Sequence, residues 1–203
     1  MRGKIGVVGR NVGGVVGVQA AYFDYFQDYG DVVIINPIVD VPDESLDLLV
    51  LPGGPDILDG TPTTDTGSPD VFFEFFDKYV LWQYIQLAEM PILGVCRGFQ
   101  TLNRHFGGRI TQHVHNTYSI PRDKLVETIT MTDKETFKVN SMHHQAVFVE
   151  QLAADLECIG KSKEFLNVEI FHHRSLKIMG VQFHPEEFRP HIVNSFISTC
   201  MGN

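Results

Sequence analysis

The segment PILGVCRGFQ at residues 91–100 constrains this chain more than any other. Its apolar run at residues 92–95 predicts a buried strand, and residues 99–105 have the pattern of a helix. Cys96 therefore lies at a strand-to-helix turn. At such a turn, free backbone N–H groups and the positive end of the helix dipole stabilise a thiolate, the nucleophilic form of cysteine. The segment predicts an α/β fold with a nucleophile at a strand–helix elbow.

A second segment supplies a base and a carboxylate. The sequence GVQFHPE at residues 180–186 ends an apolar run with His184 and places Glu186 two positions further on. A nucleophilic cysteine needs a base, and the base needs a group that orients it. Cys96, His184 and Glu186 can therefore form a catalytic triad. Spacing alone leaves open packing roles for the cysteine and the histidine, since most cysteines are buried packing residues.

These segments resemble the signature motifs of a known superfamily. The nucleophile segment and the His-Pro-Glu segment are similar to those of class I glutamine amidotransferase-like proteins. Arg97 and the segment VNSMHHQ are more similar to free-standing hydrolases of the peptidase C26, γ-glutamyl-γ-aminobutyrate hydrolase type than to synthetase-bound amidotransferases. The matching segments occur in order at residues 51–54, 94–100, 139–145 and 180–186.

The resemblance implies a three-layer, open, mostly parallel sheet with helices on both faces, flavodoxin-like in its arrangement. We expect residues 1–203 to form a single catalytic domain of this kind, because 203 residues with 43% hydrophobic content suit one sizeable core. The alternation of strand and helix patterns agrees with a parallel sheet. Residues 9–14 and 59–70, rich in turn-forming residues, are expected to be loops. The expected strands cover residues 5–8, 32–35, 46–51, 92–95, 125–131, 137–140, 152–159, 166–171 and 177–182, and the expected helices cover 18–29, 71–89, 99–105 and 188–200.

The resemblance also implies roles for residues around the triad. The backbone amides of Gly54 and Arg97 are expected to form an oxyanion hole, with Gly53 as the alternative donor beside the substrate. Gln100 lies one helical turn beyond Cys96 and can face the same ligand, so we expect it to contact the glutamyl group. The remaining candidate substrate-binding residues share one segment: Ser141, His143 and His144.

Neither a metal nor a cofactor is expected. The histidine pairs at 113/115, 143/144 and 172/173 lack the three- or four-residue spacing of helical metal ligands, and no cysteine pair supports them. Three cysteines are too few and too scattered for a disulfide framework, so Cys158 and Cys200 are interpreted as packing residues. A reducing cytoplasm is the expected location.

Charge and hydropathy restrict the partners. A formal net charge of −9 argues against binding to nucleic acid or to anionic membranes. No apolar stretch approaches the roughly 18 residues that span a bilayer. A small γ-glutamyl compound or glutamine is the expected substrate. Aromatic residues on more than one face of residues 71–89 leave open a homodimer, and the chain could instead serve a synthetase as its glutaminase component.

Three function classes follow from these observations. A self-sufficient γ-glutamyl hydrolase is favoured by Arg97 and the histidine-rich segment at residues 139–145. A glutaminase that delivers ammonia to a separate synthetase is the alternative. A binding or regulatory protein on the same fold is disfavoured, because all three triad positions carry the required residue types.

Overall fold

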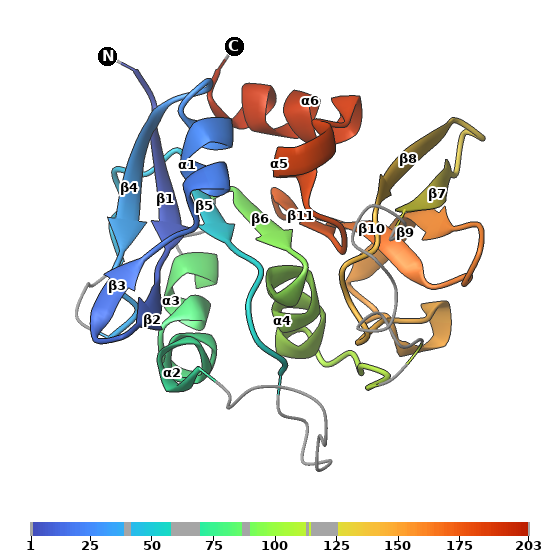
Figure 1. Ribbon diagram of the computed structural model, residues 1–203, viewed down its shortest axis with the longest axis horizontal. Coiled ribbons are helices and arrows are strands. Elements are labelled where there is room, and N and C mark those ends of the chain that lie inside the picture. The colour runs from blue at the N-terminus through green and yellow to red at the C-terminus, as the bar shows by residue number, and fades with distance from the viewer. Residues whose placement is uncertain are drawn as a thin grey trace.

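A nine-stranded mixed sheet organises the chain (Figure 1). The computed structural model describes residues 2–38, 42–57, 70–86, 90–112, 114 and 126–202. The first five strands in spatial order pair in parallel, and the remaining pairings are antiparallel. The strand order is β4 (Asp31–Ile35), β1 (Lys4–Val8), β5 (Leu48–Leu51), β6 (Ile92–Val95), β11 (Ile178–Val181), β10 (Val168–His173), β9 (Leu156–Ser162), β7 (Val126–Met131) and β8 (Thr136–Asn140).

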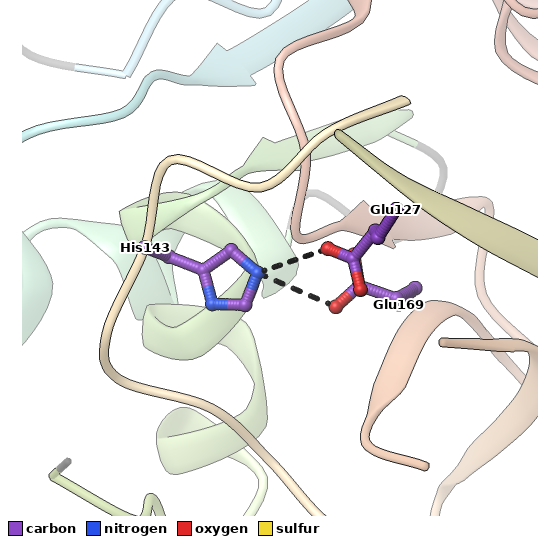
Figure 2. Close-up of side chains that lie close together, drawn as sticks. All are labelled: Glu127, His143 and Glu169. Carbon is purple, nitrogen blue, oxygen red and sulfur yellow. Dashed lines mark hydrogen bonds and ion pairs between the residues drawn. The ribbon is translucent and has the colours of Figure 1, made fainter. Parts of the chain in front are cut away.

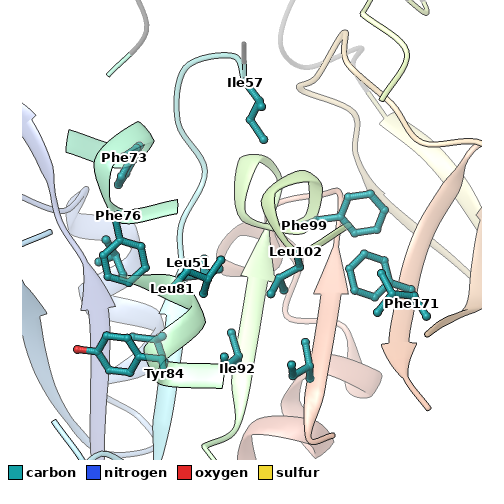
Figure 3. Packing of buried hydrophobic residues seen from close by; sticks show 14 of the residues in the cluster. Leu51, Ile57, Phe73, Phe76, Leu81, Tyr84, Ile92, Phe99, Leu102 and Phe171 are labelled. Carbon is teal, nitrogen blue, oxygen red and sulfur yellow. The ribbon is translucent and has the colours of Figure 1, made fainter. Parts of the chain in front are cut away.

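Helices cover both faces of the sheet and make it the middle of three layers, as predicted (Figure 1). Alternate side chains of a strand point to opposite faces, so Leu48 and Val50 of β5 enter one core while Leu49 and Leu51 enter the other. In the second core the rings of Phe99 and Phe171 pack against each other (Figure 3), with 4.6 Å between their centroids. The first core is covered by α1 (Ala20–Phe26) and α6 (His191–Cys200), and the second by α2 (Val71–Tyr79), α3 (Leu81–Gln86) and α4 (Arg97–His105).

Three expectations about elements are wrong. Residues 9–14 belong to a hairpin of β2 (Arg10–Val12) and β3 (Val15–Gly17) rather than a loop. The helix expected at residues 71–89 is divided into α2 and α3 at Val80, and its last residues, 87–89, lie outside the described residues. The helix expected at 188–200 begins only at His191 as α6, after a separate short helix α5 (Pro185–Phe188). Arg189, which ends α5, has a left-handed backbone and Pro190 follows it, so the helix cannot continue through this point.

Two further expectations concern the surface. The loop expected at residues 59–70 and the histidine pair 113/115 lie outside the described residues, apart from Asp70, whose side chain caps α2. The aromatic residues of α2 and α3 divide between the core and the surface. Phe73, Phe76 and Tyr84 are buried, whereas Phe75, Tyr79 and Trp82 are exposed. Among the described helices, none is both long and apolar enough to cross a bilayer.

The sheet topology brings the predicted motifs together. The neighbouring parallel strands β5, β6 and β11 are followed by residues 52–57, by Cys96 and by His184, respectively. Because parallel strands end at the same edge of a sheet, these three segments meet there. The backbone N–H of Cys96 donates to the carbonyl of Val181 at 2.8 Å, which extends the pairing of β6 and β11 up to the turn.

Candidate active site

Cys96 lies at a strained turn between β6 and α4. Its backbone has φ 51° and ψ −100°, a conformation that is costly for a residue with a side chain and that is found at functional sites. The turn is tight because the first turn of α4 packs directly on the end of β5. A Cβ atom at Gly98 would overlap the carbonyl oxygen of Leu51, so only glycine fits there. The thiol is 8% exposed, at the predicted elbow.

His184 and Glu186 form a close pair. The Nδ1 atom of His184 lies 2.8 Å from Oε1 of Glu186, and the carboxylate side chain is 3% exposed. Burial alone would lower the pKa of His184, but hydrogen bonds to Cys96 and Glu186, together with their negative charges, raise it to about 10. Since Nδ1 faces Glu186, Nε2 is the nitrogen left to serve the Cys96 sulfur. The structure thus brings the three predicted triad residues together.

Tyr22 joins this group, although the sequence analysis did not assign it to the site. Its hydroxyl accepts a hydrogen bond from the backbone N–H of Gly53 at 2.8 Å and lies 3.4 Å from Nδ1 of His184. Burial, followed by the charge of Glu186, raises the pKa of Tyr22 well above its usual range, so the hydroxyl stays protonated. A buried tyrosine hydroxyl needs a hydrogen-bond partner. A tyrosine on the apolar face of α1 was therefore the signal in the sequence that this helix contacts a polar group.

The two glycines after β5 differ in what their amides do. The N–H of Gly53 is bound by Tyr22, whereas those of Gly54 and Arg97 donate to no other described residue. The amide of Arg97 opens α4, where the first N–H groups of a helix have no partner within it. A Cβ atom at Gly53 would come within 2.7 Å of Cε1 of His184, so the missing side chain lets the imidazole lie against the backbone.

The side chain of Arg97 turns away from the thiol and binds α2. Its Nη2 atom lies 2.9 Å from Oε1 of Glu74, and Nη1 lies 2.8 Å from Oδ2 of Asp77. The guanidinium also lies over the ring of Phe73, with 4.8 Å between Cζ and the ring centroid. Arg97 is 4% exposed, whereas the side chains of Glu74 and Asp77 are partly exposed, so a buried guanidinium connects the elbow to two half-buried carboxylates of α2.

Asn140 fixes the backbone of His184 and was also missed as an individual residue. Its Oδ1 atom accepts from the N–H of His184 at 2.9 Å, and its Nδ2 atom donates to the carbonyl of His184 at 3.2 Å. Nδ2 also donates to Glu187 at 2.9 Å. The side-chain amide of Asn140 thus binds both backbone groups of His184 and holds the proposed base in place.

Gln100 is buried and hydrogen-bonded within the protein. Its Nε2 atom donates to the backbone carbonyl of Gln145 and to Oε1 of Gln182, both at 3.1 Å, and the residue is 2% exposed. The side chain of Gln145 bonds in turn to both backbone groups of Ile57 and to Gln112. Through Gln100 and Gln145, these bonds connect the nucleophile helix, the strand end before His184 and the segment after β5.

The three candidate residues of the segment 141–145 are all buried. Ser141, His143 and His144 are between 3% and 6% exposed. Nε2 of His144 lies 3.0 Å from Oδ1 of Asp56, which ties this segment to the glycine-containing loop. Nε2 of His143 faces two carboxylates of the sheet instead. The other cysteines fit packing roles, because burial raises the pKa of Cys158 and raises that of Cys200 to about 11.

Comparisons with known proteins agree with this architecture. The family model described as Peptidase C26 matches residues 16–186. A glutamine amidotransferase-like protein, YvdE, of Lactococcus lactis is 32% identical over 192 residues, which cover 83% of this chain and 80% of that protein. One component of the glutamine-hydrolysing GMP synthase of Thermococcus kodakarensis is 30% identical over 161 residues, covering 75% of this chain and 74% of that protein.

Solved structures show the same fold. A GMP synthase component of Thermoplasma acidophilum superposes with a TM-score of 0.70 at 23% identity, over 100% of this chain and 96% of that one. A glutamine amidotransferase of Thermotoga maritima gives a TM-score of 0.60 at 16% identity, over 92% and 77% of the two chains. Fold and comparisons together define a class I glutamine amidotransferase-like enzyme, a class of hydrolases and amidotransferases. Within that class the chain belongs to the Peptidase C26 family.

Proposed function

We propose that this chain is a cysteine-dependent hydrolase that cleaves the γ-glutamyl amide bond of a small γ-glutamyl compound. The observation that carries the proposal is the position of Cys96, on a strained elbow beside a His184–Glu186 pair whose imidazole carries a raised pKa. An imidazolium next to the sulfur favours the thiolate.

The first half of the proposed reaction forms a thioester. The Cys96 thiolate attacks the δ-carbonyl carbon of the γ-glutamyl amide, and the carbonyl oxygen becomes an oxyanion. The amides of Gly54 and Arg97, which donate to no partner in the described part of the chain, are suited to stabilise that charge. When the C–N bond breaks, Nε2 of His184 gives its proton to the leaving nitrogen, and the amine departs.

The second half returns the enzyme to its starting state. Water attacks the thioester carbon while Nε2 of His184 takes one of its protons. The C–S bond then breaks, glutamate leaves, and the thiolate–imidazolium pair is restored. Throughout, Glu186 holds Nδ1 of His184 so that Nε2 faces the reaction. We propose backbone groups near Ser141, His143 and His144 as the site for the α-amino and α-carboxylate ends of the substrate.

A glutaminase that serves a separate synthetase is the second candidate. The observation that favours it is the 30% identity to one component of a glutamine-hydrolysing GMP synthase, over three quarters of both proteins. The same chemistry at Cys96 would apply, with ammonia as the leaving group. The exposed aromatic residues Phe75, Tyr79 and Trp82 would then be available for a synthetase partner.

Turnover by the purified chain alone tests the proposal. Glutamate release is measured with glutamine and with a panel of γ-glutamyl amines and γ-glutamyl dipeptides, and Cys96→Ala serves as the blank. We expect fast release with at least one panel member, and capture of the thioester by hydroxylamine as a γ-glutamyl hydroxamate. Cys158→Ala is the matched control and keeps full activity. Slow hydrolysis of glutamine alone would support the glutaminase, and activity that survives in Cys96→Ala would exclude both.

A further inference from the structure

Three buried side chains from separate segments converge at the base of the segment 141–145. Glu127 comes from β7, Glu169 from β10 and His143 from the segment itself, and each is between 0% and 4% exposed (Figure 2). Nε2 of His143 lies 3.4 Å from Oε1 of Glu127 and 3.5 Å from Oε1 of Glu169. One donor atom from each residue falls within 4.8 Å of the other two.

The other ring nitrogen of His143 decides what Nε2 can do. Nδ1 lies 3.0 Å from the backbone carbonyl of Gln145, which can only accept a hydrogen bond, so Nδ1 carries a proton. Nε2 therefore presents a lone pair to two carboxylates unless something positive lies between them. This arrangement, in which one histidine nitrogen donates to a carbonyl while the other is left for binding, is typical of metal ligands.

Charge balance also requires a positive occupant. Two carboxylates and a neutral imidazole carry a charge of −2 in a site closed to solvent, which is costly without compensation. Protons and a divalent cation are therefore the two competing occupants.

The uncoordinated oxygens favour the cation. The Oε2 atoms of Glu127 and Glu169 are buried with no hydrogen-bond partner among the described residues. A proton on Nε2 of His143 would bind the two Oε1 atoms, so both Oε2 atoms would remain without a hydrogen-bond donor among the described residues. A divalent cation would neutralise the cluster and could also bind a second oxygen of either carboxylate.

The distances around Nε2 of His143 are compatible with a cation between the three side chains. Charge-assisted N–H···O bonds are usually about 2.7–2.9 Å long, and both contacts of His143 are longer. Two ligand atoms bound tetrahedrally at Zn–N and Zn–O distances of about 2.0–2.2 Å lie about 3.4 Å apart. The observed separations of 3.4 Å and 3.5 Å match that distance between two ligand atoms. The amide of Asn167 donates to Oε1 of Glu169, which would orient this ligand from outside the site.

We propose that Glu127, His143 and Glu169 form a structural site for a divalent first-row metal ion, Zn²⁺ or Mn²⁺. One imidazole nitrogen with two carboxylates suits these ions, and a carboxylate that binds through both oxygens completes the coordination. The ion would anchor the segment 141–145 to the sheet and so fix Gln145, which holds Gln100 and Ile57. The sequence analysis expected no metal from the spacing of its histidine pairs. It did not consider this cluster, because the three ligands come from separate segments without any short spacing.

Metal content after refolding tests the site. The full chain is unfolded with a chelator, refolded separately with EDTA, ZnCl₂ or MnCl₂, and desalted before the bound metal is measured by mass spectrometry. We expect about one ion per chain, and an unfolding midpoint about 5–10 °C above that of the EDTA sample. Glu127→Gln and Glu169→Gln should lower the bound metal at least tenfold. Glu157→Gln is the matched control, because Glu157 faces His172 at 3.5 Å in an exposed pair, and it should bind as the wild type does.

A second measurement needs no variant. Wild-type chain refolded with Co²⁺ should show visible absorption bands of an ion bound to nitrogen and oxygen ligands. Less than about a tenth of an ion per chain with both metals, together with equal unfolding midpoints, would overturn the proposal and leave protons as the occupants of the cluster. Loss of metal in Glu157→Gln would overturn it as well, because the ion would then lie at the surface pair.

Discussion

The hydroxyl of Tyr22 lies 3.4 Å from Nδ1 of His184 while accepting a hydrogen bond from the amide of Gly53. One side chain of α1 thereby connects the proposed base to the loop that carries the proposed oxyanion donor. The contact also orients the Gly53 peptide, and the N–H of its neighbour Gly54 donates to no other described residue. The contacts of Tyr22 are to Nδ1 of His184 and to the Gly53 amide, neither of which takes part in bond making or breaking in the proposed reaction, so we assign it a positioning role.

We expect Tyr22→Phe to lower kcat/KM about tenfold, because the loss of one buried hydrogen bond is worth roughly 1–1.5 kcal/mol. The loss should fall on kcat, since the loop and the base would be less well placed for the transition state. Steady-state kinetics on the substrate found by the panel measures it. Tyr25→Phe is the matched control: it removes a hydrogen bond of 2.7 Å from the same helix to Asn194 and should leave the kinetics unchanged. Equal kinetic losses in both variants would contradict the positioning role.

The pH dependence of stability should report on His184, whose pKa is raised first by Cys96 and then by the carboxylate of the His184 and Glu186 pair. The pKa of His184 is raised to about 10 in the folded protein, against about 6.5 in an unfolded chain. Between these values the folded state binds more protons than the unfolded state, so the free energy of unfolding decreases as the pH rises. The contribution of the pair is therefore complete below about pH 6.5 and is lost by about pH 10.

Glu186→Gln should shrink this window, because the neutral amide no longer stabilises the imidazolium. Urea unfolding at pH 6, 8 and 10 would show a smaller decrease in the variant than in the wild type. Glu157→Gln, which removes the carboxylate beside the exposed His172, is the control and should follow the wild-type curve. An unchanged slope in Glu186→Gln would refute the assignment of the raised pKa to this carboxylate.

Strands and motifs could be predicted from the sequence where burial determines the pattern. The strand predicted at residues 92–95 is confirmed with the same bounds. It was predictable because all four of its residues are buried. The hairpin of β2 and β3 was missed because its residues are exposed or half-buried, so its valines do not form the continuous buried run of a core strand. Its turn at Gly13 and Gly14, both with positive φ, was the available clue. The division of the helix at Val80 has no glycine or proline to announce it.

The candidate site divides in the same way. Cys96, His184 and Glu186 could be named because each belongs to a short motif in which chemistry and spacing coincide. Tyr22 and Asn140 act on His184 from elements far away in sequence, and their contacts exist only after the sheet has formed. Gln100 shows the opposite case. Helical spacing predicted that it lies one turn beyond Cys96, which the structure shows. The spacing could not predict the hydrogen bonds of its amide nitrogen to Gln145 and Gln182.

Gln100→Met tests whether this residue binds substrate or supports the protein. The variant removes the donor to Oε1 of Gln182 in a buried site and leaves the carbonyl of Gln145 with only Nδ1 of His143, so we expect the free energy of unfolding to fall by about 1–3 kcal/mol. KM should change little if the role is internal support. Urea unfolding and steady-state kinetics on the same preparation separate the two roles, with the exposed Gln27→Met as the control. A large rise in KM at unchanged stability would restore the predicted substrate contact.

Arg97 combines a backbone role at the elbow with a side-chain role in holding α2, and the two can be separated by substitution. Arg97→Met keeps the backbone amide but leaves the carboxylates of Glu74 and Asp77 without their cation. Burial already raises the pKa of Asp77 despite Arg97, so the uncompensated charge should be costly. We expect the free energy of unfolding to fall by about 2–4 kcal/mol, near the lower range for breaking a buried ion pair. Urea unfolding measures it.

Two companion variants make the Arg97 result interpretable. Arg174→Met removes an exposed ion pair with Glu157 and should change stability by less than about 1 kcal/mol. Adding Asp77→Asn to Arg97→Met removes the stranded charge, and this double variant should recover part of the lost stability. If it recovers none, the cost of Arg97→Met lies in the lost packing against Phe73 instead of the ion pair. If the double variant also regains turnover, the amide of Arg97 is sufficient for the oxyanion role and its side chain serves only to hold α2.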